Sequence, residues 1–559
     1  MLKSNLMASL TPITGLLGAK NAAHFLRRAT FGPTRVKIDE FASKTITEAL
    51  ADVMQDLPTP DAPLDPGTGE NWLPKPGELN SGDESLIEYF KGWFMELMRT
   101  TGMNMTEKMT FFYHAFLPAD HSLIRNTTSI YYQNALYRQY AFGNLKELLT
   151  KVCVDNAMLF YIDNTLNDKD EPNENFAREL MELYTIGKGD QIGPEDYTNY
   201  TEDDVKQAAR VLTGIKHDFD FETIDPDTGL PRGKVSPEGI MAERHDADPK
   251  TFTDKFNNRV IELDPDDPLM MVDGVATEAG FFDEIDQLID MIYDQEETAK
   301  FFCRRLYRFF VYYKITDEIE QDIITPLADT LRNNNYETKP VLEQLLSSEH
   351  FFDLNNSSTT DVNIGAIIKS PIDLIVGTFR FFNLSMPTEL MDLYHVAYGQ
   401  GISRLLTYQG IDFYTPIDVA GYPPYHQVPA YNRNWISPNN LAQRYHFANE
   451  ITNGKMNEDT EVMLYQLDIV EYVSNPANVS DPSNPTALVS ELTDYLFTQD
   501  LPAERFNFFL NNVLLDTLSA ANWTIEWNNY VATSDDSGVR SQLEKLIISI
   551  MQSPEYQLF

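Results

Sequence analysis

Three carboxylates and one arginine lie within nine residues of the segment PNENFARELMELYTIG, residues 172–187. They are Glu174, Arg178, Glu179 and Glu182. On a helix, Glu174 and Glu182 are each four residues from Arg178 and can pair with it, whereas Glu179 lies at a different azimuth. Such a group of charged residues has two interpretations. It can carry out acid–base or metal-assisted chemistry, or it can form an ion-pair network that braces helices. Glu174 and Glu179 are therefore candidate catalytic residues, and Arg178 is a candidate substrate-binding residue.

A second candidate is the tripeptide Arg244-His245-Asp246. A histidine beside aspartates on a loop suits a general base or a metal ligand, so His245 and Asp246 join the candidate catalytic residues. The alternative is a loop held by a hydrogen bond from the histidine to the backbone. The spacings of known zinc sites are absent. The cofactor is therefore unknown, and a divalent metal is one option that the carboxylates leave open.

Other polar residues have a weaker claim to function. His114, in the run FFYHAF, lies on an aromatic face, where a histidine is more often part of the core. The acidic loops at residues 225–229 and 264–267 alternate oxygen donors, but neither completes a calcium-binding loop, and turn formation explains them equally well. The motifs GxSxG, GxxxxGK[ST] and GxGxxG are absent, which argues against common hydrolase, nucleotide-binding and dehydrogenase classes.

The elements that must position these residues are helices. In residues 172–187 apolar residues recur at spacings of three and four, which predicts one buried stripe, and Gly187 stands where a C-terminal cap would stand. The next helix is predicted to open at Thr201, with Asp204 completing an acidic capping box, and to close at Gly214.

Helical periodicity also dominates the rest of the chain, and strand signals are few. The sequence therefore predicts a mostly α, multi-helix globular protein with a few short strands or hairpins in an inserted region. Residues 219–224 and 251–261 are expected to form a hairpin around the His245 loop.

Three regions are predicted. An N-terminal helical region spans residues 1–214 and carries a Pro- and Gly-rich excursion at residues 57–82. An irregular insertion follows at residues 215–280. A C-terminal helical region, residues 281–559, is expected to pack on the first as one continuous unit.

An aromatic stretch at residues 411–438 belongs to that last region. Its prolines and glycine argue against helix, and its aromatic residues argue against disorder, so it is predicted to be a packed loop. Trp435 in this loop is a candidate substrate-binding residue, and the loop as a whole could instead meet a partner.

Composition excludes one class of partner. The chain carries 85 acidic and 43 basic residues, a net charge of −42, so nucleic acid is not expected to bind. The basic clusters Arg27-Arg28 and Arg304-Arg305 with Arg308 stand among apolar residues and are interpreted as arginines that tie helices together.

Two cysteines, Cys153 and Cys303, stand in apolar surroundings and are interpreted as core thiols. No apolar run reaches the length of a transmembrane helix. Residues 6–19 resemble a signal peptide only faintly, because polar residues interrupt them and no cleavage site is evident. The localisation is uncertain: the balance favours a cytoplasmic protein, with the cell envelope or secretion as the alternatives.

Several long motifs occur in an order that resembles a known family. They are AAHFLRRATFGPT (22–34), KMTFFYHAF (108–116), NENFARELMELYTIG (173–187), YTxxDVxxAARxLTG (200–214), RHD (244–246), FCRRLYRFF (302–310), KSPIDLIVG (369–377) and a Gly-Gln, Gly-Tyr-Pro and Trp-Ile-Ser-Pro series between Gly399 and Pro438. Together they resemble the bacterial family catalogued as domain of unknown function 1800. The sequence of these motifs is most similar to that of members from Bacteroidetes.

The resemblance implies no activity, because none is assigned to that family. Its members are often encoded beside a second protein that resembles sulfatases, which implies a possible protein partner of that kind; the oligomeric state is unknown. Two hypotheses remain. One is an acid–base or metal-assisted hydrolase with Glu174, Glu179, His245 and Asp246 around one cleft. The other is a non-catalytic binding or assembly protein whose charged motifs are structural.

Overall fold

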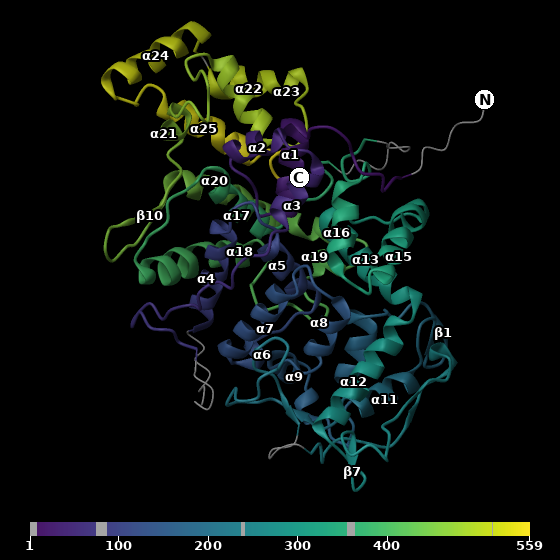
Figure 1. Cartoon of the computed structure of the whole chain (residues 1–559). Coiled ribbons are helices and arrows are strands. Elements are labelled where there is room, and N and C mark those ends of the chain that lie inside the picture. The colour runs from purple at the N-terminus through teal and green to yellow at the C-terminus, as the bar shows by residue number, and fades with distance from the viewer. Residues whose placement is uncertain (1–7, 74–85, 236–240, 355–363, 517) are drawn as a thin grey trace, which may run out of the picture.

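The structure is a computed structural model that describes residues 8–73, 86–235, 241–354, 364–516 and 518–559. In these ranges the chain is mostly α-helical, as predicted, and its strands form only short two-stranded antiparallel sheets (Figure 1). The excursion predicted at residues 57–82 is described only as far as residue 73. Residues 1–7 and 74–82 lie outside the described part of the chain.

The helices fall into two groups along the chain. The first group is α1 (Gly18–Ala29), α2 (Arg35–Ala42), α3 (Ile46–Val53), α4 (Leu86–Thr100), α5 (Thr106–Phe116), α6 (His121–Ile124), α7 (Thr127–Gln139), α8 (Leu145–Val152), α9 (Asn156–Tyr161), η1 (Asn164–Leu166), α10 (Asn175–Glu179), η2 (Leu180–Tyr184) and α11 (Glu202–Val211). The second group is η3 (Asp254–Phe256), α12 (Glu278–Tyr293), α13 (Glu296–Phe310), α14 (Asp317–Ile319), η4 (Glu320–Ile324), α15 (Thr325–Asn333), α16 (Thr338–Ser347), α17 (Pro371–Phe381), η5 (Met391–Ser403), α18 (Arg404–Tyr408), α19 (Pro423–His426), η6 (Tyr431–Ile436), α20 (Pro438–Asn453), α21 (Ile469–Ser474), α22 (Pro485–Leu496), α23 (Ala503–Asn507), η7 (Phe508–Leu514), α24 (Ala520–Thr533) and α25 (Arg540–Met551).

The strands pair locally. The pairs are β1 (Gln191–Gly193) with β2 (Asp196–Tyr197), β3 (Ile215–Lys216) with β4 (Lys234–Val235), β5 (Lys250–Thr251) with β6 (Val260–Ile261), β7 (Met271–Val272) with β8 (Val275–Ala276), and β9 (Lys455–Met456) with β10 (Met463–Tyr465).

The expected hairpin between residues 219–224 and 251–261 is wrong. Residues 250–251 instead pair with residues 260–261, in the register Lys250↔Ile261 and Thr251↔Val260. The chain reverses inside this segment because Asn257 and Asn258 both adopt positive φ, the left-handed conformation that asparagine tolerates. Residues 219–224 contribute only an isolated bridge, from Ile224 to Pro231.

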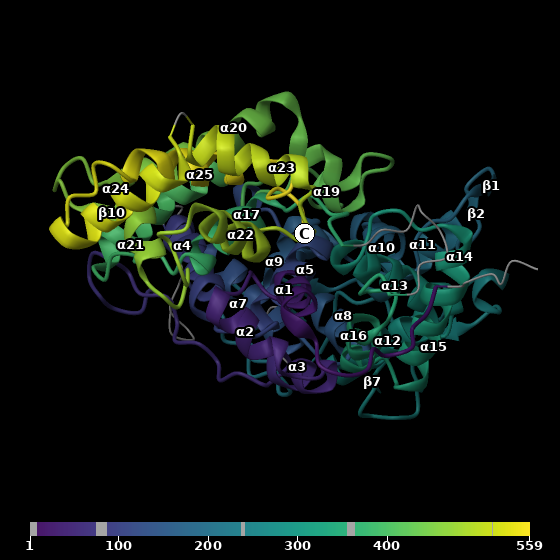
Figure 2. The same ribbon diagram turned by 90° about the horizontal axis from the view of Figure 1, so that it is seen from above.

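One hydrophobic core runs through the molecule. Its buried residues extend along the chain from Ile13 to Tyr556. Figures 1 and 2 place α21, α24 and α25 at one end of the molecule and α11, α12 and β1 at the other. The N-terminal helices α1 and α2 lie beside C-terminal helix α22, where Arg35 pairs with Glu491 at 2.5 Å.

Buried arginines join these distant segments. Arg28, with 1% of its surface exposed, donates to the carbonyl oxygens of Phe310, Val311 and Phe559. Arg380 donates to the carbonyl oxygen of Gly32 and to carbonyl oxygens in the last turn of α4 and just after it. The interpretation of the Arg27-Arg28 cluster as a tie between helices is confirmed.

The aromatic stretch at residues 411–438 is packed, as predicted, although it contains the short helices α19 and η6. Tyr422 and Trp435 are each about 1% exposed. The cysteines Cys153 and Cys303 are both buried free thiols. Among the described residues, no helix combines the length and the apolar character that crossing a membrane requires.

Candidate functional site

The segment with the carboxylates folds as α10 followed by the π-helix η2. In it Arg178 is held by two carboxylates: Nη1 donates to Glu202 on α11 at 2.6 Å, and Nη2 donates to Glu174 at 2.9 Å. The Arg178 and Glu174 side chains are 31% and 37% exposed. Two of the predicted site residues therefore form a partly exposed ion-pair network that joins α10 to α11.

His245 belongs to a different network, which is sealed from solvent. Its Nε2 lies 2.8 Å from the carboxylate of Glu284 on α12, its Nδ1 lies 3.0 Å from the carbonyl oxygen of Thr213, and Lys250 also pairs with Glu284. The side chains of His245, Glu284 and Lys250 are each 0% exposed. In this arrangement His245 cannot reach a substrate that arrives from solvent.

Asp246 is also neutralised. It accepts two hydrogen bonds from Arg210, at 2.6 Å from Nε and 3.2 Å from Nη2. Arg210 stands in the last turn of α11, whereas Glu202, the partner of Arg178, stands in its first turn. Eight residues of helix separate the two ion pairs by about 12 Å. The structure thus places the two predicted sets at opposite ends of α11 rather than around one point.

Glu179 differs from these residues because, among the described residues, it makes no hydrogen bond and no ion pair. Its side chain is half-buried. Burial, followed by the charge of Glu182, raises the pKa of Glu179 to about 7; Arg178 and Lys188 oppose this shift, and Asp418 adds to it. A carboxyl group with a pKa near 7 can either donate or accept a proton at neutral pH.

The elements around Glu179 come from three parts of the chain. The π-helix η2 begins directly after it, and such turns occur often at functional sites. Tyr184, at the end of η2, donates to the carbonyl oxygen of Val419 at 3.3 Å, which brings the 411–438 loop over this helix. Burial, and then the charges of Asp120, Asp418 and Glu179, raise the pKa of Tyr161 at the end of α9.

The loop adds two titratable groups. His426 Nε2 lies 3.7 Å from Asp418 Oδ1, and the two side chains are 17% and 50% exposed. Burial and then Arg305 lower the pKa of His426, while Asp418 opposes this effect. The charge of Asp418 acts on Glu179, and Asp418 in turn lies near His426. We call Glu179, Asp418 and His426 the Glu179 cluster.

Trp435 lines a cavity that borders the same loop. The cavity is also lined by Lys108 from α5, Arg308 from α13, Asp373 from α17 and Tyr431 from η6. It offers about 30 Å³, room for one or two water molecules. Because Trp435 is buried, a ligand can contact it only by entering this cavity.

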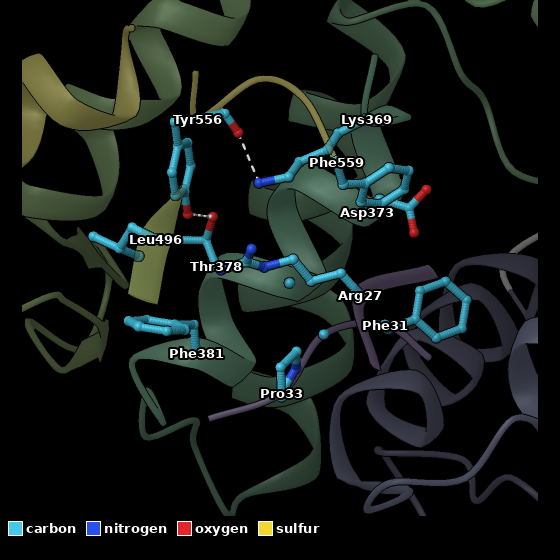
Figure 3. A pocket seen from close by; sticks show the side chains of 12 residues that line it. Arg27, Phe31, Pro33, Lys369, Asp373, Thr378, Phe381, Leu496, Tyr556 and Phe559 are labelled. Carbon is cyan, nitrogen blue, oxygen red and sulfur yellow. Dashed lines mark hydrogen bonds between the residues drawn. The ribbon is translucent and has the colours of Figure 1, made fainter. Parts of the chain in front are cut away.

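A second cavity lies beyond Asp373 and is shown in Figure 3. Its walls include Arg27, Lys369 and Tyr556, and it also offers about 30 Å³. Lys369 donates to the carbonyl oxygen of Tyr556 at 2.7 Å, and Figure 3 shows the Asp373 carboxylate directed away from that amine. Burial, and then the charges of Arg27 and Arg444, lower the pKa of Lys369 well below its ordinary value.

The remaining candidates from the sequence have structural contacts. His114 is fully buried against Tyr414, and its Nε2 lies 3.0 Å from the hydroxyl of Tyr422; burial lowers its pKa to about 3. In the acidic loop at residues 225–229, Asp225 and Asp227 pair with Lys151. Among the described residues, no group of three or more His, Cys, Asp or Glu side chains is arranged to hold a metal ion.

Sequence reasoning missed Asp418 and His426 as neighbours of Glu179, and Lys108, Lys369 and Asp373 as cavity residues. The last three stand inside the motifs KMTFFYHAF and KSPIDLIVG. The sequence signal that could have identified these three residues is that each is a charged residue within an otherwise apolar motif. This signal does not show which distant motif the residue contacts.

The comparisons with known proteins agree with the motifs. No curated protein and no solved structure matches the chain. A family model described as "Protein of unknown function (DUF1800)" matches residues 24–558, nearly the whole chain, and the protein therefore belongs to the DUF1800 family.

Proposed function

We propose that the protein is an acid–base hydrolase in which Glu179 transfers the proton. The observation that carries this proposal is the half-buried Glu179 carboxyl, which has no neutralising partner among the described residues and whose pKa burial raises to about 7. General acid–base catalysis is most efficient when the pKa of the group lies near the working pH.

The Glu179 cluster supplies the further groups that hydrolysis needs. A general acid requires a second group that orients or activates water on the other side of the bond to be broken. Asp418 and His426 are partly exposed and come from a loop that packs over η2. We assign the proton transfer to Glu179 and the positioning of water to Asp418 and His426.

A second candidate function is a non-catalytic binding or assembly role. It is favoured by the ion pairs of Glu174 and Asp246 and by the sealed position of His245, which leave three of the four predicted catalytic residues in structural networks. In that case the 411–438 loop would meet a protein partner. A partner resembling sulfatases remains a prediction.

Chromogenic esters, glycosides, amides and phosphate esters form a suitable substrate panel for the full chain. With a substrate that is turned over, Glu179→Gln should lower kcat/KM by about 100-fold or more, because removal of a general acid or base has that effect. Glu174→Gln is the matched control on the same helix and should change kcat/KM by only a few fold. Equal activity of the wild-type protein and Glu179→Gln would refute the proposal. A wild-type protein inactive on the whole panel would favour the binding role.

A further inference from the structure

Helix α13 carries three arginines with different surroundings. Arg304 pairs with Glu297 at 2.5 Å and with Glu320 at 2.6 Å. Arg305 and Arg308, among the described residues, make no hydrogen bond and no ion pair. Their guanidinium groups instead lie over aromatic rings: that of Arg305 is 5.3 Å from the ring centres of Phe116 and Phe301, and that of Arg308 is 5.3 Å from Tyr431.

Burial makes this lack of partners costly. Both side chains are half-buried, and Nε of Arg308 is buried without an acceptor among the described residues. A buried polar or charged group without a partner is destabilising, and an aromatic face offsets only part of that cost. The chain has 85 acidic residues. In the described part of the chain none forms an ion pair with either guanidinium, and the charge of Glu320 reaches Arg308 without a direct contact.

The two arginines also line neighbouring cavities. Arg308 lines the cavity of Trp435, and Arg305 lines a smaller one next to it; Phe309 and Tyr425 are common to both. Arg305 and Arg308 are three residues apart on one helix, so their side chains leave the same face. A small group held between them could contact both.

Asp373, the acidic residue that lines the cavity of Trp435, already has partners. Asp373 pairs with Lys108 and accepts a hydrogen bond from Ser370 at 2.7 Å. Lys108 and Asp373 balance each other, so the cavity of Trp435 keeps the positive charge of Arg308. Lys369, on the far side of Asp373, is likewise turned toward a carbonyl oxygen rather than toward this carboxylate (Figure 3).

We propose that Arg305 and Arg308 bind an oxyanion group, a sulfate, phosphate or carboxylate, carried by a ligand. The planar guanidinium forks suit two-pronged contacts with such oxygens. The cavity has room for only about one or two water-sized groups, so it takes in only the oxygens that face Arg308. The remainder of the ligand lies outside it, beside Tyr431 and Tyr313, which also line the cavity. This proposal does not rest on the proton transfer assigned to Glu179, although the charge of Arg305 also lowers the pKa of His426 in the Glu179 cluster.

Calorimetric titration of the full chain tests the proposal. The titrants are sodium sulfate, sodium phosphate and sodium acetate, each at constant ionic strength in chloride buffer. At least one of the three anions should bind, and its Kd should rise about tenfold or more in Arg305→Gln and in Arg308→Gln, since each variant removes a charge-assisted contact. Arg304→Gln removes the same charge from the same helix and should leave the Kd within about twofold. Arg308→Lys keeps the charge without the fork and should lie between.

The three anions separate the possible sources. Binding of sulfate and phosphate without acetate identifies a tetrahedral oxyanion, and binding of acetate alone identifies a carboxylate. Binding of all three identifies a site that accepts either kind of group. If Arg308→Gln does not fold, Arg308→Lys and Arg305→Gln give the answer. The site is refuted if no anion binds beyond chloride, or if Arg304→Gln weakens binding as much as the other two variants.

Discussion

Neighbouring carboxylates on one helix differ in chemistry because of what surrounds each one. Glu174 faces Arg178 and is held in an ion pair, and Glu182 receives hydrogen bonds from Lys188 at 3.1 Å and Tyr200 at 3.3 Å. Among the described residues no cation pairs with Glu179, and burial together with the charge of Glu182 raises its pKa, although Arg178 and Lys188 partly oppose that shift. The same residue type is therefore structural at two positions and available for proton transfer at the third.

The raised pKa of Glu179 has a consequence for stability. Between its ordinary pKa of 4.5 and about 7, the folded protein keeps the Glu179 proton while the unfolded chain has lost it. The folded state binds more protons there, so the stability of the wild-type protein relative to Glu179→Gln should fall as pH rises through this window and level off above it. The change should not exceed about 2 kcal/mol, because solvent screens a partly exposed group. Urea unfolding of the wild-type protein and Glu179→Gln from pH 4.5 to 8 measures this change in stability. A stability difference that does not vary with pH would contradict the raised pKa of Glu179. Glu174→Gln is the control.

The two ion-pair networks should differ in their contribution to stability. Because Arg178 is partly exposed, Arg178→Ala should cost about 1 kcal/mol or less. Glu284→Ala should cost about 3–5 kcal/mol, because it leaves the amine of Lys250 buried without its partner. Denaturant unfolding of both variants at neutral pH measures the two losses of stability. Equal losses would show that solvent exposure does not control how much these ion pairs stabilise the protein.

At the scale of elements, α11 is fixed at both ends by the chain that follows it. The predicted capping box is confirmed: Thr201 Oγ1 accepts from the backbone of Asp204, and the Asp204 carboxylate accepts from the backbone of Thr201. The other end meets the His245 loop at Gly214, where φ is +86° and an added Cβ would lie 2.6 Å from the His245 backbone nitrogen. A glycine here permits both the left-handed turn and the close approach.

Gly214→Ala should therefore destabilise the protein by about 2–4 kcal/mol, from backbone strain together with the clash. Gly229→Ala is the matched control, since Gly229 also has positive φ (+69°) but nothing lies within 4 Å of an added Cβ. It should cost only about 1 kcal/mol. Thermal melting of the two variants compares them. If Gly229→Ala proved as damaging as Gly214→Ala, the contact with His245 would not be the reason.

At the scale of the whole molecule, the charges are distributed unevenly between surface and interior. The net charge is −42, yet the interior around Asp373 holds several cations, among them Lys108, Lys369 and Arg444. The acidic residues consequently repel one another mainly across the surface, where salt can screen them.

Raising sodium chloride from about 0.01 M to about 0.5 M should increase Tm by several degrees, because the Debye length falls from about 30 Å to only a few Å. Differential scanning calorimetry at fixed pH measures this shift. A fall in Tm would mean that the surface ion pairs contribute more than the excess negative charge costs.

The sequence by itself determined the class of fold, because helical periodicity and caps depend on residues three or four positions apart. It identified α11 with its capping box, the pairing of Glu174 with Arg178, and the packed 411–438 loop. It also favoured burial of Arg27, Arg28 and both cysteines, since these residues stand inside apolar runs.

Only the tertiary structure decided which charged residues meet. His245 and Glu284 are 39 positions apart, and Lys108 and Asp373 are 265 positions apart. Glu179 and His245 both looked available in the sequence, because each stands beside charged residues in its own segment. The two residues differ in burial and in partners. His245 is buried against the Glu284 carboxylate on α12. The side chain of Glu179 stays partly exposed, and the loop that packs on its helix is more than 230 positions away. Exposure and charge balance are properties of packed surfaces, and no local pattern of residue types fixes them.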